Sequence, residues 1–334
     1  MSWALRPGPA ALVERLFPGS SVQPVASDAS TRRFYRIIPV GGVSWILMDY
    51  GAPFDGETDD VRLARLFQEA GLPVARVEHV RPEEGCLVLE DLGSRTLKST
   101  LAALEPGDTV ARERLYQQAV SLAVAIATRG TASLGRSNRA SSPALDSERL
   151  RFEMDFFLEH YAAGLAGVRA APAGLVAALH DLAERAADCA HPVLCHRDFH
   201  SRNLMVRDDE SLALVDIQDA RRGPLGYDLV SLVYDAYASL DDDLSSSLIE
   251  SFRDTLPGAP PRDVFEAGLV VVAAQRLIKA LGTFGYQATV LGRRRYLEGV
   301  PRTLERLARL LPRSPETAPV AEGLLSVGLL DFRP

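Results

Sequence analysis

The stretch with the clearest chemical meaning is residues 196–203, which read H-R-D-F-H-S-R-N. It matches the pattern H-R-D-x-x-x-x-N found in the catalytic loop of phosphoryl-transfer enzymes. In such a loop Asp198 can accept the proton of an attacking hydroxyl group, and Asn203 can turn back to bind Mg²⁺. We therefore predict that Asp198 is a catalytic base and that Asn203 is a metal ligand.

A second metal ligand should follow the loop, because a magnesium ion that bridges two phosphates is normally held by a carboxylate as well. Two short strand-like runs, residues 203–206 and 212–216, are separated by a polar turn at 207–211, and Asp216 ends the second run. Each part of this pattern also occurs by chance in polar loops with satisfied hydrogen bonds, but the ordered set is specific. We predict that Asp216 binds the metal.

Two histidines flank the predicted base. His196, Asp198 and His200 could be interpreted as an alternating set of metal ligands, but no further His or Cys cluster completes a zinc site. We favour a structural role for His196, which would brace the loop through a backbone hydrogen bond. His200 is either close to the substrate or simply exposed.

The elements that must position these residues fall into two groups. Before residue 90, the runs 34–39, 45–50, 75–80 and 86–90 are typical of strands, and residues 59–70 have helical spacing of apolar side chains. After residue 90 the composition favours helices, at residues 108–129, 147–165, 173–190, 228–237, 261–284 and 303–311. The expected fold is α+β and protein-kinase-like, with a β-rich nucleotide-binding N-lobe (1–90), a hinge (91–94) and a mainly helical C-lobe (95–334) that carries the catalytic loop and the substrate site.

Several parts of a protein kinase are missing. The sequence has no G-x-G-x-x-G-x-V, no V-A-I-K and no A-P-E, and Asp216 begins D-I-Q instead of D-F-G. Between Asp216 and the helix expected near Asp228 there is room for a short loop only. A peptide-docking segment would not fit, so the substrate should be small.

The chain resembles the aminoglycoside phosphotransferase/choline kinase superfamily, and more narrowly the bacterial anomeric kinases of N-acetylmuramate and N-acetylglucosamine that act in peptidoglycan recycling. The resemblance extends over roughly residues 10–300, and its motifs lie at 27–36, 47–49, 89–93, 196–206, 215–220 and 223–232. It implies ATP-dependent O-phosphorylation with Mg²⁺. On that basis we expect the protein to phosphorylate a hydroxyl of an amino sugar, plausibly at C1.

The resemblance also implies nucleotide contacts. Backbone groups of Glu90, Asp91 and Leu92 would hold adenine, and residues 27–33 would replace the glycine-rich loop. The hydroxyl and guanidinium groups that would meet phosphate oxygens belong to four residues of that segment: Ser30, Thr31, Arg32 and Arg33. The strand 45–50 departs from the pattern, because it lacks the lysine that should face the phosphates. Arg32 or Arg33 could supply that charge, or both could be solvated side chains.

Four further polar residues have two possible roles each. Asp219 could touch sugar or metal, or fix the loop that follows Asp216. Asp228 begins a helix and more plausibly caps it or braces the catalytic loop. Arg276 and Lys279, with Tyr286 nearby, could face the substrate and, in a muramate kinase, meet a lactyl carboxylate; exposed charge is the alternative for each.

The bulk composition excludes some classes of partner. The net charge is −7 and the pI about 5.5, which disfavours nucleic acid. No apolar run is long enough to cross a membrane, and the N-terminus does not read as a signal peptide, so we expect a cytoplasmic protein whose partners are ATP and a small amino sugar. Two alternatives remain: a kinase of aminoglycosides or choline-like amino alcohols, with residues 241–243 as a candidate acidic pocket, and a nucleotide-binding pseudokinase.

Overall fold

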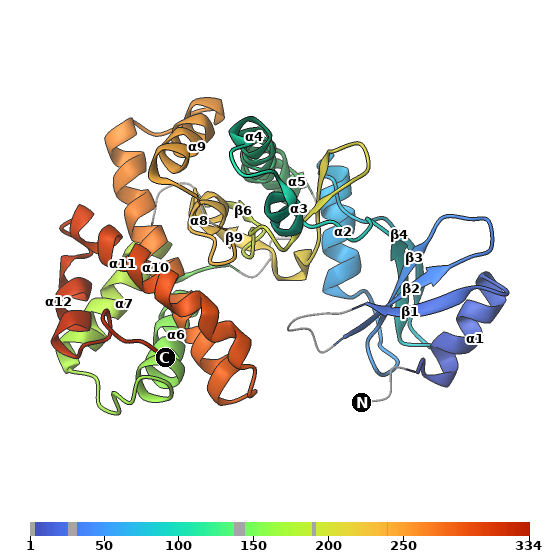
Figure 1. Ribbon diagram of the computed structural model, residues 1–334, viewed down its shortest axis with the longest axis horizontal. Coiled ribbons are helices and arrows are strands. Elements are labelled where there is room, and N and C mark those ends of the chain that lie inside the picture. Colours follow the sequence, from blue (N-terminus) through green and yellow to red (C-terminus); the bar gives the residue numbers. More distant parts are fainter. Residues whose placement is uncertain (1–3, 26–31, 137–143, 189–191, 239) are drawn as a thin grey trace. The chain divides into compact units, whose positions relative to one another are not determined.

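The computed structural model describes residues 4–25, 32–136, 144–188, 192–238 and 240–334 (Figure 1). The chain forms two compact units. The first comprises residues 1–95 and 205–218, and the second comprises residues 96–204 and 219–334. The expected lobe boundaries at 90 and 94 remain a prediction.

A five-stranded antiparallel sheet organises the first unit, in the order β1-β2-β3-β5-β4. The strands are β1 (Ser21–Val25), β2 (Arg33–Ile38), β3 (Trp45–Asp49), β4 (Val77–Arg81) and β5 (Cys86–Glu90). The strands β7 (Leu204–Val206) and β8 (Leu212–Leu214) pair with each other. The strands expected in the N-lobe are thus present within one or two residues of their expected bounds.

Two helices cover opposite faces of this sheet, as Figure 1 shows: α1 (Pro7–Leu16) and α2 (Asp59–Glu69). Successive residues of a strand point to opposite faces, so Leu47 packs with α1 residues whereas Met48 packs with Val61 of α2. The sequence predicted one helix here and missed α1. The helix begins with Pro7, Gly8 and Pro9, which are poor helix formers in general, although proline is well tolerated in the first turn of a helix.

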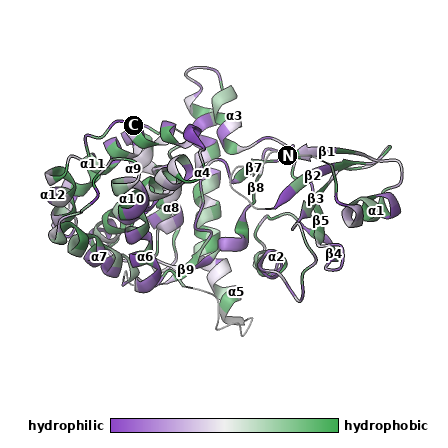
Figure 2. Cartoon of the chain, turned by 90° about the horizontal axis from the view of Figure 1, so that it is seen from below, coloured by the Kyte–Doolittle hydropathy of each residue, from purple (hydrophilic) through white to green (hydrophobic). Residues whose placement is uncertain are grey.

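The second unit is mainly helical. Its helices are α3 (Leu97–Ala103), α4 (Thr109–Ala125), α5 (Thr131–Arg136), α6 (Ser147–Phe157), α7 (Ala173–Ala187), α8 (Tyr227–Val233), α9 (Asp242–Thr255), α10 (Arg262–Thr289), α11 (Val300–Leu310) and α12 (Ala318–Ser326). The π-helical segments Ile126–Gly130 and Leu158–Ala163 continue α4 and α6. In Figure 2 the peripheral helices mix purple and green residues, as helices that bury one face do.

Helix α10 is the centre of this unit and packs against α6, α7, α8 and α11. Two glycines of α10 allow a close approach to the backbone of α6 and of its π-helical continuation. A Cβ on Gly285 would lie 2.4 Å from the carbonyl oxygen of His160, and one on Gly282 would lie 2.9 Å from Cα of Phe157. The strand β6 (Val193–Cys195) pairs with β9 (Arg221–Gly223), and residues 196–203 follow β6. Because α10 packs directly on the backbone of α6, side chains of both helices reach these residues.

Of the helices that the structure describes, none combines the length and the uninterrupted apolar character needed to span a bilayer.

Candidate active site

The loop of residues 196–203 follows β6, and a side chain of α8 stabilises its conformation. Arg197 has a φ of +83°, which an L-residue rarely adopts. Both carboxylate oxygens of Asp228 accept backbone hydrogen bonds at this bend, from the N–H of His196 at 2.7 Å and from that of Arg197 at 2.9 Å. Asp228 thus braces the loop, and burial raises its pKa.

The carboxylate of Asp198 lies between two cations of α10. Its Oδ1 is 3.1 Å from Nζ of Lys279 and 3.7 Å from Nη2 of Arg276, and its side chain is 30% exposed. Burial by itself would raise the pKa of Asp198, but the positive charges of Lys279 and Arg276 outweigh it and hold the pKa far below its ordinary value. Asp198 is therefore an ionised, accessible carboxylate, able to accept a hydrogen bond from a hydroxyl group.

Asn203 is oriented by the same loop. Its side-chain Nδ2 donates to the backbone oxygen of Asp198 at 3.0 Å, and its backbone N–H donates to the carbonyl of His200 at 2.9 Å. With the amide nitrogen used in this way, the amide oxygen is the atom that can bind a metal. An amide oxygen and a carboxylate are hard donors of the kind that Mg²⁺ prefers, so the residue types fit such an ion.

Asp216, the other predicted ligand, belongs to the first unit, whereas Asp198 and Asn203 belong to the second. Asp216 follows β8 with a φ of +63°, is exposed, and accepts a hydrogen bond from Nε2 of Gln218 at 2.8 Å. In the described part of the chain, no three or more His, Cys, Asp or Glu side chains form a metal cluster, so His196, Asp198 and His200 are not one. Convergence of Asn203 and Asp216 on one metal ion beside Asp198 stays a prediction.

Beneath the loop lies a charged network that sequence reasoning missed. Arg197 donates to Oε1 of Glu153 at 2.8 Å, and its Nη1 is 3.3 Å from Asp219. Oε2 of Glu153 accepts from Nε2 of Gln275 at 2.9 Å. Burial would raise the pKa of Glu153, but the charges of Lys279 and Arg197 reverse this and lower it. One signal was present: Glu153 falls on the helix face that is otherwise lined by apolar residues such as Leu150 and Phe157.

The remaining candidates near the loop have identified neighbours. The guanidinium of Arg276 donates through Nε to Oγ of Ser231 at 3.0 Å. The His200 ring lies 5.2 Å from that of Tyr237, and burial lowers its pKa. Tyr286 instead packs on the rings of Phe156 and His160 at 5.4 and 5.0 Å.

In the first unit, Arg32 and not Arg33 is integrated into the fold. Arg32 forms an ion pair with Asp60 of α2 and lies over the ring of Tyr50, whose hydroxyl donates to Asp60 at 2.6 Å. Arg33 is exposed at the start of β2. The predicted phosphate contacts Ser30 and Thr31 lie outside the described residues.

The three residues predicted to lie beside adenine follow one another at the end of β5. Asp91 pairs with Arg36 at 2.5 Å and accepts the N–H of Gly93, and Glu90 pairs with Arg76 at 3.2 Å. Leu92 is buried. The two carboxylates are thus engaged within the first unit, which leaves backbone groups of this segment as the candidates for adenine.

Comparison with known proteins supplies independent information. The model of the phosphotransferase enzyme family matches residues 21–265. An N-acetylmuramate/N-acetylglucosamine kinase of Pseudomonas aeruginosa is 31% identical over 317 residues, which cover 93% of this chain and 89% of the relative. The enzyme of the same name from Neisseria meningitidis serogroup B is 28% identical, with 88% of this chain and 87% of the relative covered.

Solved structures resemble the chain at lower identity. A choline/ethanolamine kinase family protein from Mesorhizobium loti matches with a TM-score of 0.59 at 16% identity. The match covers 95% of this chain and 98% of the Mesorhizobium chain. An aminoglycoside phosphotransferase in complex with ADP and hygromycin B has a TM-score of 0.58 at 16% identity, with coverage of 94% and 97%.

Proposed function

The chain belongs to the phosphotransferase enzyme family, and we propose that it phosphorylates a hydroxyl group of an amino sugar, at C1 of N-acetylmuramate, N-acetylglucosamine or both. As a member of this family it is an ATP-dependent phosphotransferase that acts on an alcohol group. Its fold is the protein-kinase-like fold of the aminoglycoside phosphotransferases and choline kinases, which confirms the fold class expected from the sequence.

The observation that carries the choice of acceptor is the pair of cations beside Asp198. Lys279 and Arg276 both approach the oxygen that would receive the acceptor's proton. A cationic acceptor such as choline or an aminoglycoside would have to bring its own positive charge toward these groups, which is unfavourable in a poorly solvated site. A neutral or acidic sugar meets no such repulsion. The names of the relatives support the same choice.

The alternative acidic pocket has a structural use in the fold. Asp241 caps α9 by accepting the N–H of Leu244 at 2.8 Å, and Asp242 and Asp243 stand exposed in its first turn. Carboxylates in these positions stabilise a helix N-terminus. The run therefore supplies no argument for a cationic acceptor.

In the proposed reaction, Asp198 accepts a hydrogen bond from the sugar hydroxyl and orients its oxygen toward the γ-phosphorus. Since the pKa of Asp198 is low, the carboxylate is a weak base that takes the proton as the new O–P bond forms. The bond between the γ-phosphorus and the bridging oxygen then breaks, and the products are the sugar phosphate and ADP. Such a reaction depends mainly on positioning and electrostatics.

Asn203 and Asp216 would hold the divalent ion, Mg²⁺, which when bound neutralises charge on the phosphates. Arg32 is our candidate for the missing strand lysine. Its pairing with Asp60 of α2 parallels the ion pair of a strand lysine with a helix glutamate in protein kinases. Among the described residues of the first unit, Arg33 forms no ion pair comparable to that of Arg32 with Asp60.

The test is a panel of acceptors with ATP and Mg²⁺: N-acetylmuramate, N-acetylglucosamine, choline and an aminoglycoside. We expect ADP release with the first two acceptors. Phosphorus NMR of the product should show a phosphate on C1, and this phosphate should be acid-labile. Turnover restricted to the cationic acceptors would overturn the proposal. Phosphate on another oxygen would leave a sugar kinase but refute the C1 assignment.

A further inference from the structure

Two cations of α10 share one carboxylate oxygen. Arg276 and Lys279 are three residues apart, so their side chains leave the same face of the helix. Both lie closest to Oδ1 of Asp198, at 3.7 and 3.1 Å, and they are 11% and 15% exposed. These side chains are nearly buried but remain reachable from solvent, as is Asp198 itself.

The neighbouring carboxylates are engaged elsewhere. Glu153 accepts from Arg197 and Gln275. Asp219 lies near Arg197 and Arg221. Within the described ranges of the chain, Asp198 is the carboxylate that forms ion pairs with Arg276 and Lys279. Two positive charges therefore face one negative charge at Oδ1 of Asp198. Glu153, whose charge also acts on Lys279, already accepts hydrogen bonds from Arg197 and Gln275.

Arg276 and Lys279 also have more N–H donors than the hydrogen bonds they form. An ammonium has three N–H donors and a guanidinium has five. Among the residues that the structure describes, Lys279 donates one hydrogen bond, to Asp198, and Arg276 donates one through Nε, to Ser231. The pair can hold a second carboxylate without losing Ser231, since Arg276 contacts Ser231 through Nε and approaches Asp198 through Nη2.

Resting on the function proposed above, we propose that Arg276 and Lys279 bind a carboxylate group carried by the acceptor sugar, so that the preferred substrate is an acidic amino sugar. The incoming carboxylate accepts hydrogen bonds from the unused donors of the pair and competes with Asp198 for Lys279. Oδ1 of Asp198 then becomes available to the sugar hydroxyl. An acidic acceptor both binds more tightly and frees the base that its hydroxyl requires.

The experiment compares N-acetylmuramate with its methyl ester, which has nearly the same shape but no carboxylate charge. Charge-assisted hydrogen bonds of this type correspond to a preference of about ten- to a hundredfold in kcat/KM for the acid in the wild-type enzyme. Lys279→Met should reduce that ratio about tenfold or more, and Lys279→Arg should retain most of it. Arg276→Met supplies a second test if Lys279→Met does not fold.

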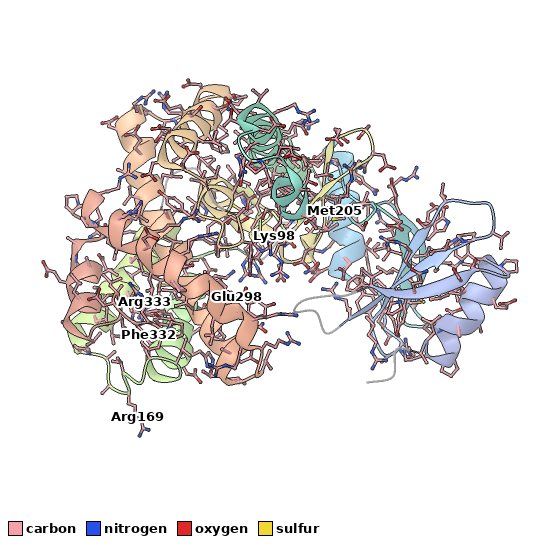
Figure 3. All side chains as sticks on the ribbon, viewed as in Figure 1. Lys98, Arg169, Met205, Glu298, Phe332 and Arg333 are labelled. Atoms are coloured by element: carbon pink, nitrogen blue, oxygen red, sulfur yellow. The ribbon has the colours of Figure 1, made fainter. Side chains whose placement is uncertain are left out.

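The chain offers a matched control, because Lys98 is its other lysine. Lys98 lies exposed on α3 of the same unit, 5.8 Å from the ring of Tyr237 (Figure 3). Lys98→Met removes the same charge and should leave the ratio of acid to ester unchanged.

Three outcomes would overturn the proposal. In the first, the wild-type enzyme uses acid and ester equally. In the second, Lys279→Met lowers both acceptors by the same factor, which would mean that Lys279 only positions Asp198. In the third, the variants raise KM for ATP without changing the ratio, which would assign the cations to nucleotide phosphate. All three leave the sugar kinase standing. Absence of turnover with every sugar in the wild-type enzyme would instead refute the proposed function.

Discussion

Replacing Glu153 by Gln tests whether the buried network beneath the catalytic loop supports it. Glu153→Gln keeps the size and shape of the side chain but removes its charge. In the wild-type protein, Oε1 of Glu153 accepts a hydrogen bond from Arg197 at 2.8 Å, and Oε2 accepts one from Gln275 at 2.9 Å. A glutamine offers one acceptor oxygen and one NH₂ group. The glutamine oxygen can accept from Arg197, and Gln275 can turn its amide so that its own oxygen accepts from the new NH₂ group. The main loss is therefore the negative charge opposite Arg197.

The magnitude follows from the contacts that are lost. A buried hydrogen bond to a charged group contributes about 1.5–3 kcal/mol. Removing one partner of a buried ion pair costs about 3–5 kcal/mol when no other countercharge is near. Arg197 keeps Asp219 at 3.3 Å, which is half-exposed. We therefore expect Glu153→Gln to lower the free energy of unfolding by about 2–4 kcal/mol.

Denaturant unfolding followed by circular dichroism and by fluorescence measures this loss, and coincident transitions justify a two-state treatment. Glu148→Gln is the matched control, because Glu148 lies exposed in the first turn of the same helix. Its effect should stay within about 1 kcal/mol. We also expect kcat to fall more than KM changes for Glu153→Gln, since Arg197 is adjacent to Asp198, the proposed base.

A loss no larger than that of Glu148→Gln would refute this reasoning, because it would mean that the Arg197 charge is adequately balanced without Glu153. An unchanged kcat in a clearly destabilised variant would separate the two roles. Glu153 would then stabilise the fold but not the position of Asp198.

Further predictions concern the base, the nucleotide and pH. Asp198→Ala should lower kcat by about a hundredfold or more while nucleotide binding stays measurable by calorimetry; wild-type turnover would disprove the base assignment. Arg32→Met should raise KM for ATP about tenfold, whereas Arg33→Met should change it less than threefold; the reverse order would exchange their roles. The lowered pKa of Glu153 means that its carboxylate stabilises the fold above the ordinary carboxyl pKa, and that this contribution is lost as pH falls through the lowered value. Denaturant unfolding at decreasing pH should therefore show the wild type losing its advantage over Glu153→Gln in acid, and a constant difference would contradict the sign.

Local patterns were sufficient where a residue's role depends on its neighbours in the chain. The spacing of Asp198 and Asn203, the alternating strands of the sheet and the apolar spacing of α2 are all short-range features, and each identified its element. The helices expected from residue 108 onward correspond to α4 and α6 with their π-helical continuations and to α7, α8, α10 and α11, with ends within about five residues of those expected. The family resemblance rested on such short motifs as well.

Other elements were invisible because their stability is not local. The strands β6 and β9 are three residues each and exist because they pair with each other. Helix α9 was not predicted, and residues 241–243 at its start were considered only as a candidate acidic pocket. Asp241 caps this helix, and its Phe252 packs against Phe265 of α10.

The sequence alone determined which residues could carry phosphoryl transfer, because a catalytic loop is a contiguous motif. Only the tertiary structure decided what surrounds Asp198. Glu153, Arg276 and Lys279 lie far from it along the chain, and they reach the loop because α6 and α10 pack backbone to backbone at Gly282 and Gly285. Charge at a site is a sum over neighbours in space, so no pattern along one segment could have predicted that two cations meet this carboxylate.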